Sequence, residues 1–339
     1  MHKVADAKDR AGEVDEQRSG ERTYVSRRVR SAISRSGLLV GLVLLFILLA
    51  SLAPNFLTSR NLLNVLRAVA FNGIIACGMT FVIISGDIDV SVGSALAWAS
   101  SLLGVLAIRH EWPLLGAVIF VLLQGIVVHA LAGFIRVKWH VPAFVVTLAL
   151  FLSLRGAARL ITNAYPITPF PDSFSFWGGG YIAQVIPVPA VLLVIIVAIF
   201  YFLSTRTVFG RSVYSVGGNE EAARLSGIDV WRTRIAIFAI NGLLAAFSGI
   251  VISSRIMSGS SNIAEGLEFD IIAAVIIGGT SLAGGEGSMI GTLLGVLFIG
   301  LLNNGMILLG ITPFAQEVVR GLIILFAVLI SVWQKPIRR

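Results

Sequence analysis

Two carboxylates stand two residues apart in a stretch of the sequence that is otherwise strongly apolar. Asp87 and Asp89 lie in the segment GDIDVSVG, with hydrophobic runs before and after it. Ionisable groups at membrane depth are costly to bury and are therefore candidates for function. Such a pair can carry protons, although the neighbouring sequence offers no partner base. Alternatively, their oxygens can cap the helix that follows.

Basic and polar side chains also interrupt other apolar runs. Arg155 and Arg159 are spaced i,i+4 and share one helical face, so they either snorkel to an outer interface or line a polar outer cavity. His129 lies deep in an apolar run and is expected to form a hydrogen bond between packed helices. Amides such as Asn303 and Asn304 suit either a polyhydroxylated solute or interhelical hydrogen bonds.

Motifs for catalysis and for nucleotide binding are missing from the sequence. It contains no GxxxxGK[ST], HExxH or GxSxG pattern, and its four histidines are scattered. The one cysteine, Cys77, lies in an apolar run and is expected to be a small buried hydrophobe. We therefore expect no catalytic residue, no metal and no cofactor in this chain.

The longest hydrophilic interruption after the N-terminal region is the polar loop, residues 205–234. Asn219 can accept hydrogen bonds from the first turn of a short helix, and Glu220 and Glu221 then lie at the positive end of its dipole. Gly227 can end that helix in a left-handed conformation. The pattern predicts a capped helix of about two turns.

Composition places the whole chain in a membrane. Hydrophobic residues make up 56% of it and charged residues 13%, whereas soluble domains have about 25% charged residues. The net charge of +8 does not indicate nucleic acid, because the basic residues cluster in loops and tails, as the positive-inside rule predicts. The sequence predicts an all-α integral membrane protein.

Hydropathy divides the chain into a tail, a membrane domain and a short end. Residues 1–36 are expected to be a disordered cytoplasmic tail, 37–333 the transmembrane domain and 334–339 a cytoplasmic end. The expected ten spans are 37–53, 62–85, 90–108, 113–135, 141–161, 188–204, 235–254, 269–283, 289–309 and 314–333.

The distribution of basic residues predicts the orientation. With the N-terminus inside, nineteen Lys and Arg fall on the cytoplasmic side and three on the outside. This asymmetry favours an orientation in which both termini and the polar loop lie in the cytoplasm. The loop 162–187, rich in Pro, Phe, Gly and Trp, is then outside, either as an aromatic belt or as a cap on an outer vestibule.

The two halves of the chain echo each other. The run 82–86 (VIISG) leads to Gly93-Ser94, and the run 275–279 (VIIGG) leads to Gly287-Ser288. Repeated broken segments in two halves of a membrane protein often mark a transport pathway.

Several of these segments resemble a known family. Glu221-Ala222-Ala223-x-x-x-Gly227 resembles the Glu-Ala-Ala-x-x-x-Gly loop of binding-protein-dependent ABC importer permeases. The segment 277–288 (IGGTSLAGGEGS), with 291–293 (GTL) and 301–305 (LLNNG) after it, resembles the signature of ribose/xylose/galactose-type sugar permeases. The segments 78–80 (GMT) and 88–94 (IDVSVGS) are similar to the first half of that family, and the resemblance covers about 37–333. Asp87 and Glu286 depart from it, since glycine and a basic residue are common there.

The resemblance implies an architecture and partners. It implies about ten helices in a vitamin-B12-importer-like arrangement, a homodimer or a pair with a close paralogue, and a sugar-binding protein in the periplasm. It also implies cytoplasmic ATP-binding domains, possibly a tandem fusion, which bind ATP and Mg. The loop residues that would couple the chain to the ATPase are Asn219, Glu220, Glu221, Ala222, Ala223, Arg224 and Gly227. The candidate pathway residues are Asp89, Ser91, Gly93, Gly278, Gly279, Thr280, Ser281, Gly284, Gly285, Asn303 and Asn304.

The sequence is compatible with three kinds of function. The sequence favours the permease subunit of an ATP-driven importer of a pentose or hexose in a bacterial inner membrane. A stand-alone sugar carrier coupled to protons through Asp87 or Asp89 is the alternative. A membrane enzyme acting on lipid-linked substrates would require a carboxylate and basic cluster at one interface, which the sequence does not display.

Overall fold

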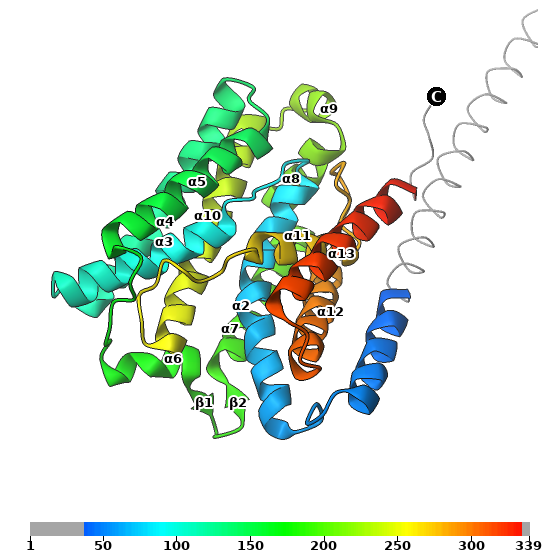
Figure 1. Ribbon diagram of the computed structural model, residues 1–339. Helices are drawn as coiled ribbons and strands as arrows, with labels where there is room; N and C mark the ends of the chain where they lie inside the picture. Colours follow the sequence, from blue (N-terminus) through cyan, green and yellow to red (C-terminus); the bar gives the residue numbers. More distant parts are fainter. Residues whose placement is uncertain (1–36, 334–339) are drawn as a thin grey trace, which may run out of the picture.

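The computed structural model describes residues 37–333, almost all of them in helices or short connections. The expected tails 1–36 and 334–339 lie outside the described residues. The helices form one bundle (Figure 1), with α8 and α9 at the end called here the upper end and the β1–β2 hairpin at the lower end. A small antiparallel sheet pairs Tyr181 with Pro187 and Ile182 with Ile186.

The elements follow one another in a single order along the chain. The first helix is Gly37–Leu52. It is followed by α2 Ser59–Ile84, α3 Val92–Gly104, the π-helical turn η1 Val105–Arg109, α4 Leu114–Lys138, α5 Ala143–Thr162, the 3-10 turn η2 Asp172–Phe174, α6 Ser175–Gly179, β1 Tyr181–Ile182, β2 Ile186–Pro187, α7 Val188–Arg206, α8 Val208–Gly218, α9 Glu220–Leu225, α10 Val230–Ile256, α11 Leu267–Ile277, α12 Met289–Leu308 and α13 Pro313–Trp333.

Seven of the described helices are long and apolar enough to cross a membrane: α2, α3 with η1, α4, α5, α7, α10 and α12. Each of the ten expected spans coincides with a helix, but Gly37–Leu52 and α11 are shorter than a full crossing requires. The chain is therefore an all-α, multi-pass membrane protein.

Helix α2 forms the centre of the bundle. In an apolar stretch of 18 residues of α2, 83% of the residues are buried, compared with 22% in the corresponding stretches of α4 and α5. Its buried residues, from Val65 to Ile84, pack in one core cluster with residues of α10, α11 and α12. A helix that is apolar on all sides and covered by its neighbours is the expected centre of a membrane bundle. The outer helices leave their apolar faces for lipid.

The lower end is organised by α6 and by the aromatic loop before it. Phe170 and Phe174 are buried in a second cluster between α3, α4 and α10. The amide of Gly178 donates to Ser254 Oγ at 2.8 Å, which fixes α6 on the end of α10. Phe176 and Trp177 remain about half exposed. The loop 162–187 thus divides its aromatic residues between the core and the surface.

The prediction of a snorkelling arginine is wrong for Arg155. This side chain is buried and donates to the carbonyls of Ser261, Ile263 and Ala264 at 2.7–3.3 Å. Residues of this segment lie outside helices, so their carbonyls need other donors, and the guanidinium supplies them. One turn later, Arg159 is exposed and pairs with Glu265 at 2.7 Å.

Candidate functional site

The two broken segments predicted from the sequence meet at the upper end of the bundle. Helix α2 ends at Ile84 and α11 at Ile277, and each is followed by glycines with positive φ, among them Gly86 and Gly285. The amide of Gly285 donates to the carbonyl of Ile84 at 2.8 Å. Next to this bond, Thr80 and Thr292 share a buried hydrogen bond of 2.7 Å between α2 and α12. The glycine-rich loop 278–288 therefore packs directly on the end of the central helix.

Helix α8 lies against this junction (Figure 1), and the sequence did not predict it. A Cβ atom on Gly217 would lie 1.7 Å from the Ile84 carbonyl oxygen and 2.7 Å from the Gly285 amide nitrogen. Tyr214 donates through its hydroxyl to the carbonyl of Gly287 at 3.0 Å. The polar loop is thus attached to both broken segments, through the backbone at Gly217 and through the hydroxyl of Tyr214.

The predicted capped helix is present as α9. The side chain of Asn219 accepts from the amide of Ala222 at 3.0 Å, and Gly227 has φ +81°. Glu221 and Arg224 form an exposed ion pair at 2.7 Å on the helix surface. Ala223 is buried against Val216 of α8 and Val230 of α10. One face of α9 is therefore packed, while its charged face is free to contact a partner.

Asp87 does not cap the helix that follows it, so that prediction is wrong. The N-cap position of α3 is Ser91, without a side-chain cap. Asp87 is buried and accepts from Arg136 Nε of α4 at 3.1 Å, and it forms an ion pair with Arg234 of α10. Arg234 also pairs with Glu220 of α9 at 2.6 Å. Both arginines stand far from Asp87 in the sequence, at 49 and 147 residues, and only their loop positions were visible there.

Asp89 lies in a different environment, sealed from solvent. One carboxylate oxygen accepts from the amide and the hydroxyl of Ser91 at 2.8 and 2.5 Å, and the other accepts from Asn241 Nδ2 at 2.9 Å. His129 Nε2 lies 3.7 Å from Asp89 and 3.3 Å from Ser91 Oγ. Asp89 thus joins the start of α3 to α4 and α10, and His129 forms the interhelical hydrogen bond predicted for it.

The remaining candidate pathway residues lie in two groups, one in contacts between helices and one in the loop 278–288. Gly93 packs so closely on the short helix α11 that an added Cβ would lie 2.1 Å from Glu268 Oε2. Asn303 donates to Asp270 at 3.0 Å, and Asn304 forms a reciprocal amide pair with Asn61. Both amide side chains therefore form hydrogen bonds between helices. The other candidates lie at the upper end, in the loop 278–288: Gly278, Gly279, Thr280, Ser281, Gly284 and Gly285. Glu286, which departs from the family pattern, is exposed in the same loop.

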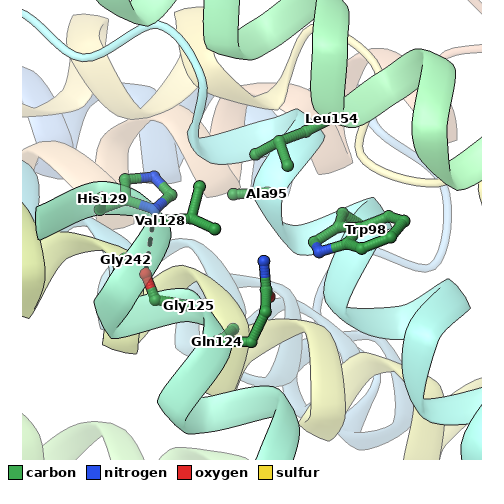
Figure 2. Close-up of a pocket in the computed structure, with 9 residues that line it drawn as sticks. Ala95, Trp98, Gln124, Gly125, Val128, His129, Leu154 and Gly242 are labelled. Atoms are coloured by element: carbon green, nitrogen blue, oxygen red, sulfur yellow. Dashed lines mark hydrogen bonds between the residues drawn. The ribbon is translucent and has the colours of Figure 1, made fainter. Parts of the chain in front are cut away.

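A narrow crevice opens between α3, α4, α5 and α10. It leaves essentially no room even for a water molecule, and Figure 2 shows Trp98 and Gln124 beside it, with His129 and Leu154 nearby. Ligand sites usually enclose about 300–1,000 Å³. The crevice is therefore smaller than a typical ligand-binding pocket.

Charged groups that could hold a metal do not gather in the part of the chain that the structure describes. Within residues 37–333, no three His, Cys, Asp or Glu side chains are grouped so that they could hold a metal ion. At the upper end, Asp87, Glu220, Glu221 and Asp229 pair with arginines, whereas Asp89 accepts from neutral donors.

Comparison with known proteins gives one family and several relatives. The family described as "Branched-chain amino acid transport system / permease component" matches residues 61–328. A probable ABC transporter permease protein, YphD of Escherichia coli (strain K12), is 47% identical over 92% of this chain and 94% of its own length. The ribose import permease protein RbsC of Bacillus subtilis (strain 168) is 44% identical over 88% and 93%.

A third relative is more distant. The xylose transport system permease protein XylH of Escherichia coli (strain K12) is 36% identical over 80% of this chain and 85% of its own length. No solved structure matches the chain.

Proposed function

This chain belongs to the family of ABC importer permease components that includes the ribose and xylose permeases, and we propose that it carries a monosaccharide across the bacterial inner membrane as the transmembrane subunit of an ATP-driven importer. The observation that carries this proposal is the 44% identity with a ribose import permease over nearly the full length of both chains. Two halves that are interrupted at the same end of the bundle agree with a transport pathway.

The finer architecture is part of the proposal. Two permease subunits, each with about ten helices in a vitamin-B12-importer-like arrangement, would enclose the pathway between them. Both termini and the polar loop would face the cytoplasm, as the asymmetry of basic residues favours. A periplasmic sugar-binding protein would deliver the substrate at the opposite end, which carries α6 and the hairpin.

The energy source would be a partner. The sequence has no phosphate-binding motif, so ATP and Mg would bind to an ABC subunit on the cytoplasmic side. Helix α9 is suited to contact that subunit, because its charged face is exposed and its other face is anchored by Ala223. Residues 219–224 and Gly227 would then transmit movement and perform no chemistry. Movement of α8 and α9 would reach the pathway through the contacts of Gly217.

A proton-coupled carrier that works alone is not favoured. The relatives are named as ABC transporter, import-permease and transport-system components. Asp87 is held by two arginines and Asp89 by three hydrogen bonds from neutral groups, so both carboxylates already have partners.

Reconstitution tests the proposal. Proteoliposomes with the chain, its ABC subunit and its binding protein are expected to take up radiolabelled ribose or xylose. Uptake should require ATP on the side of the membrane that the ABC subunit faces. The double variant Glu221→Lys plus Gly227→Pro is expected to assemble but to lose ATP-driven uptake. Uptake by the isolated chain in response to a pH gradient would refute the importer and support the carrier.

A further inference from the structure

One arginine connects the surface helix α9 to the buried break after α2. Arg234 Nη2 pairs with Glu220 Oε2 of α9 at 2.6 Å, and Nη1 pairs with Asp87. The Arg234 side chain is only 4% exposed, whereas that of Glu220 is 49% exposed. The three side chains therefore form a line from the surface into the bundle. Arg136 of α4 holds the inner end.

The chemistry of this line makes it a stiff connection. A guanidinium is planar, and its donors point in fixed directions, so its position is tied to both carboxylates. The pair of Arg234 with Asp87 is buried, and breaking it would leave an uncompensated charge, which is strongly unfavourable. A displacement of α9 is thus passed to Asp87 instead of being absorbed at Arg234.

The inner end of the line adjoins both broken segments. Asp87 follows Gly86, and its amide donates to Val82 at the end of α2. Two residues later, Asp89 bonds to Ser91 at the start of α3. The carbonyl of Ile84, three residues before Asp87, accepts from Gly285 of the loop 278–288. Movement delivered at Asp87 therefore reaches the ends of α2 and α3.

We propose that Arg234 is a positioning residue for transport, which ties the coupling helix α9 to the break between α2 and α3 through Glu220 and Asp87. The inference rests on the proposed function, because it assumes that an ATPase moves α9. A competing route exists through the apolar contact of Ala223 with Val216 and Val230. The two routes predict different results when only the charges are changed.

The chain offers matched control variants within the same loop. Asp229 and Arg232 form an exposed ion pair at 3.1 Å within the first turn of α10, with side chains 51% and 90% exposed. Asp229→Asn makes the same chemical change as Glu220→Gln and keeps an N-cap for α10, since Asn caps as well as Asp. Arg232→Lys matches Arg234→Lys, which retains the charge but lacks the planar fork.

The experiment uses the full complex in proteoliposomes and a thiol introduced by Ile88→Cys, between Asp87 and Asp89. Its rate of modification by a charged methanethiosulfonate is measured with and without ATP, in a Cys77→Ala background. In the parent, ATP is expected to change this rate several-fold. Glu220→Gln and Arg234→Lys are expected to abolish the response to ATP in assembled complexes, while Asp229→Asn and Arg232→Lys preserve it. A purely structural role would lower the yield of complex and leave the ATP response of what assembles unchanged.

The other possible results distinguish the Arg234 connection, the apolar route and the proposed function from one another. The role of Arg234 is refuted, and the apolar route supported, if ATP changes the modification rate in the parent and changes it equally in Glu220→Gln and Asp229→Asn. If the complex hydrolyses ATP but the parent thiol shows no response, the break does not move and the inference fails, while the importer stands. If the chain forms no complex with an ATPase, the proposed function itself fails.

Discussion

Asp87 and Asp89 are two residues apart and both buried, but the bundle surrounds them with different kinds of partner. Asp87 faces two arginines, from α4 and α10, and one of these continues to the surface through Glu220. Asp89 accepts from Ser91 and Asn241, which are neutral, and has His129 beside it. The first carboxylate belongs to a charge network that reaches the surface of the chain at Glu220, and the second to a hydrogen-bonded joint between helices. The difference predicts that the two sites fail in different ways.

Removal of the Asp87 carboxylate should have the largest effect on stability. Asp87→Ala leaves Arg136 and Arg234 facing each other without their shared counter-charge, and we expect a loss of about 3–5 kcal/mol. The free energy of unfolding can be measured by SDS titration in mixed micelles. Glu265→Ala, which breaks the exposed pair with Arg159, should cost less than about 1 kcal/mol. Equal losses for the two variants would show that the Asp87 network is effectively solvated.

A methyl group at Gly217 should disturb the same region without changing any charge. Its Cβ would lie 1.7 Å from the Ile84 carbonyl oxygen, a backbone atom that cannot rotate away, so we expect Gly217→Ala to cost about 3 kcal/mol. Gly218→Ala has no atom within 4 Å of its Cβ and should change stability by less than about 0.5 kcal/mol. Thermal unfolding of both purified variants measures the difference. Similar melting temperatures would mean that α8 is not packed on the end of α2.

Neutralising Asp89 should have a smaller effect than removing Asp87. Asp89→Asn retains one oxygen for Ser91 but turns an NH₂ group toward Asn241. The buried Nδ2 of Asn241 then has no acceptor, and we expect the free energy of unfolding to fall by about 2 kcal/mol. Adding Asn241→Asp exchanges donor and acceptor and should recover part of that loss in the same SDS titration. Failure of the second change to recover stability would argue against the bond between these two side chains.

Replacement of His129 should have the smallest effect. His129→Gln keeps a polar group beside Ser91, and Asp89 retains three other hydrogen bonds, so we expect about 1 kcal/mol. A loss as large as that of Asp87→Ala, measured in parallel, would instead make His129 the charged partner of Asp89. The two carboxylates would then be alike.

The sequence predicted those features that depend on local patterns. Hydropathy located all the long helices, and the types and spacing of Asn219 and Gly227 located α9 together with its caps. The breaks after Ile84 and Ile277 were visible as glycine-rich interruptions. Each of these signals is contained within a few neighbouring residues.

The features that were missed depend on residues far apart in the chain. Helix α8 buries Gly210, Val213 and Val216, a regular spacing that arginine, serine and tyrosine between them concealed. The arginines of Asp87 come from α4 and α10, and no local pattern pairs them with it. Arg155 was placed at an interface because arginines usually lie there, whereas the carbonyls that bind it belong to a segment more than 100 residues later.

The carbonyls held by Arg155 have a consequence for how the chain enters the membrane. Helix α11 has 11 residues and so is about 16 Å long, roughly half of a hydrocarbon core of about 30 Å. The segment that precedes it is irregular backbone, whose polar groups bond to Arg155 and, through Gly259, to Ile167. Such a segment is too short and too polar to partition into lipid alone. We therefore expect it to enter after α5 is in place, so that the order of insertion is set by the arginine that receives it.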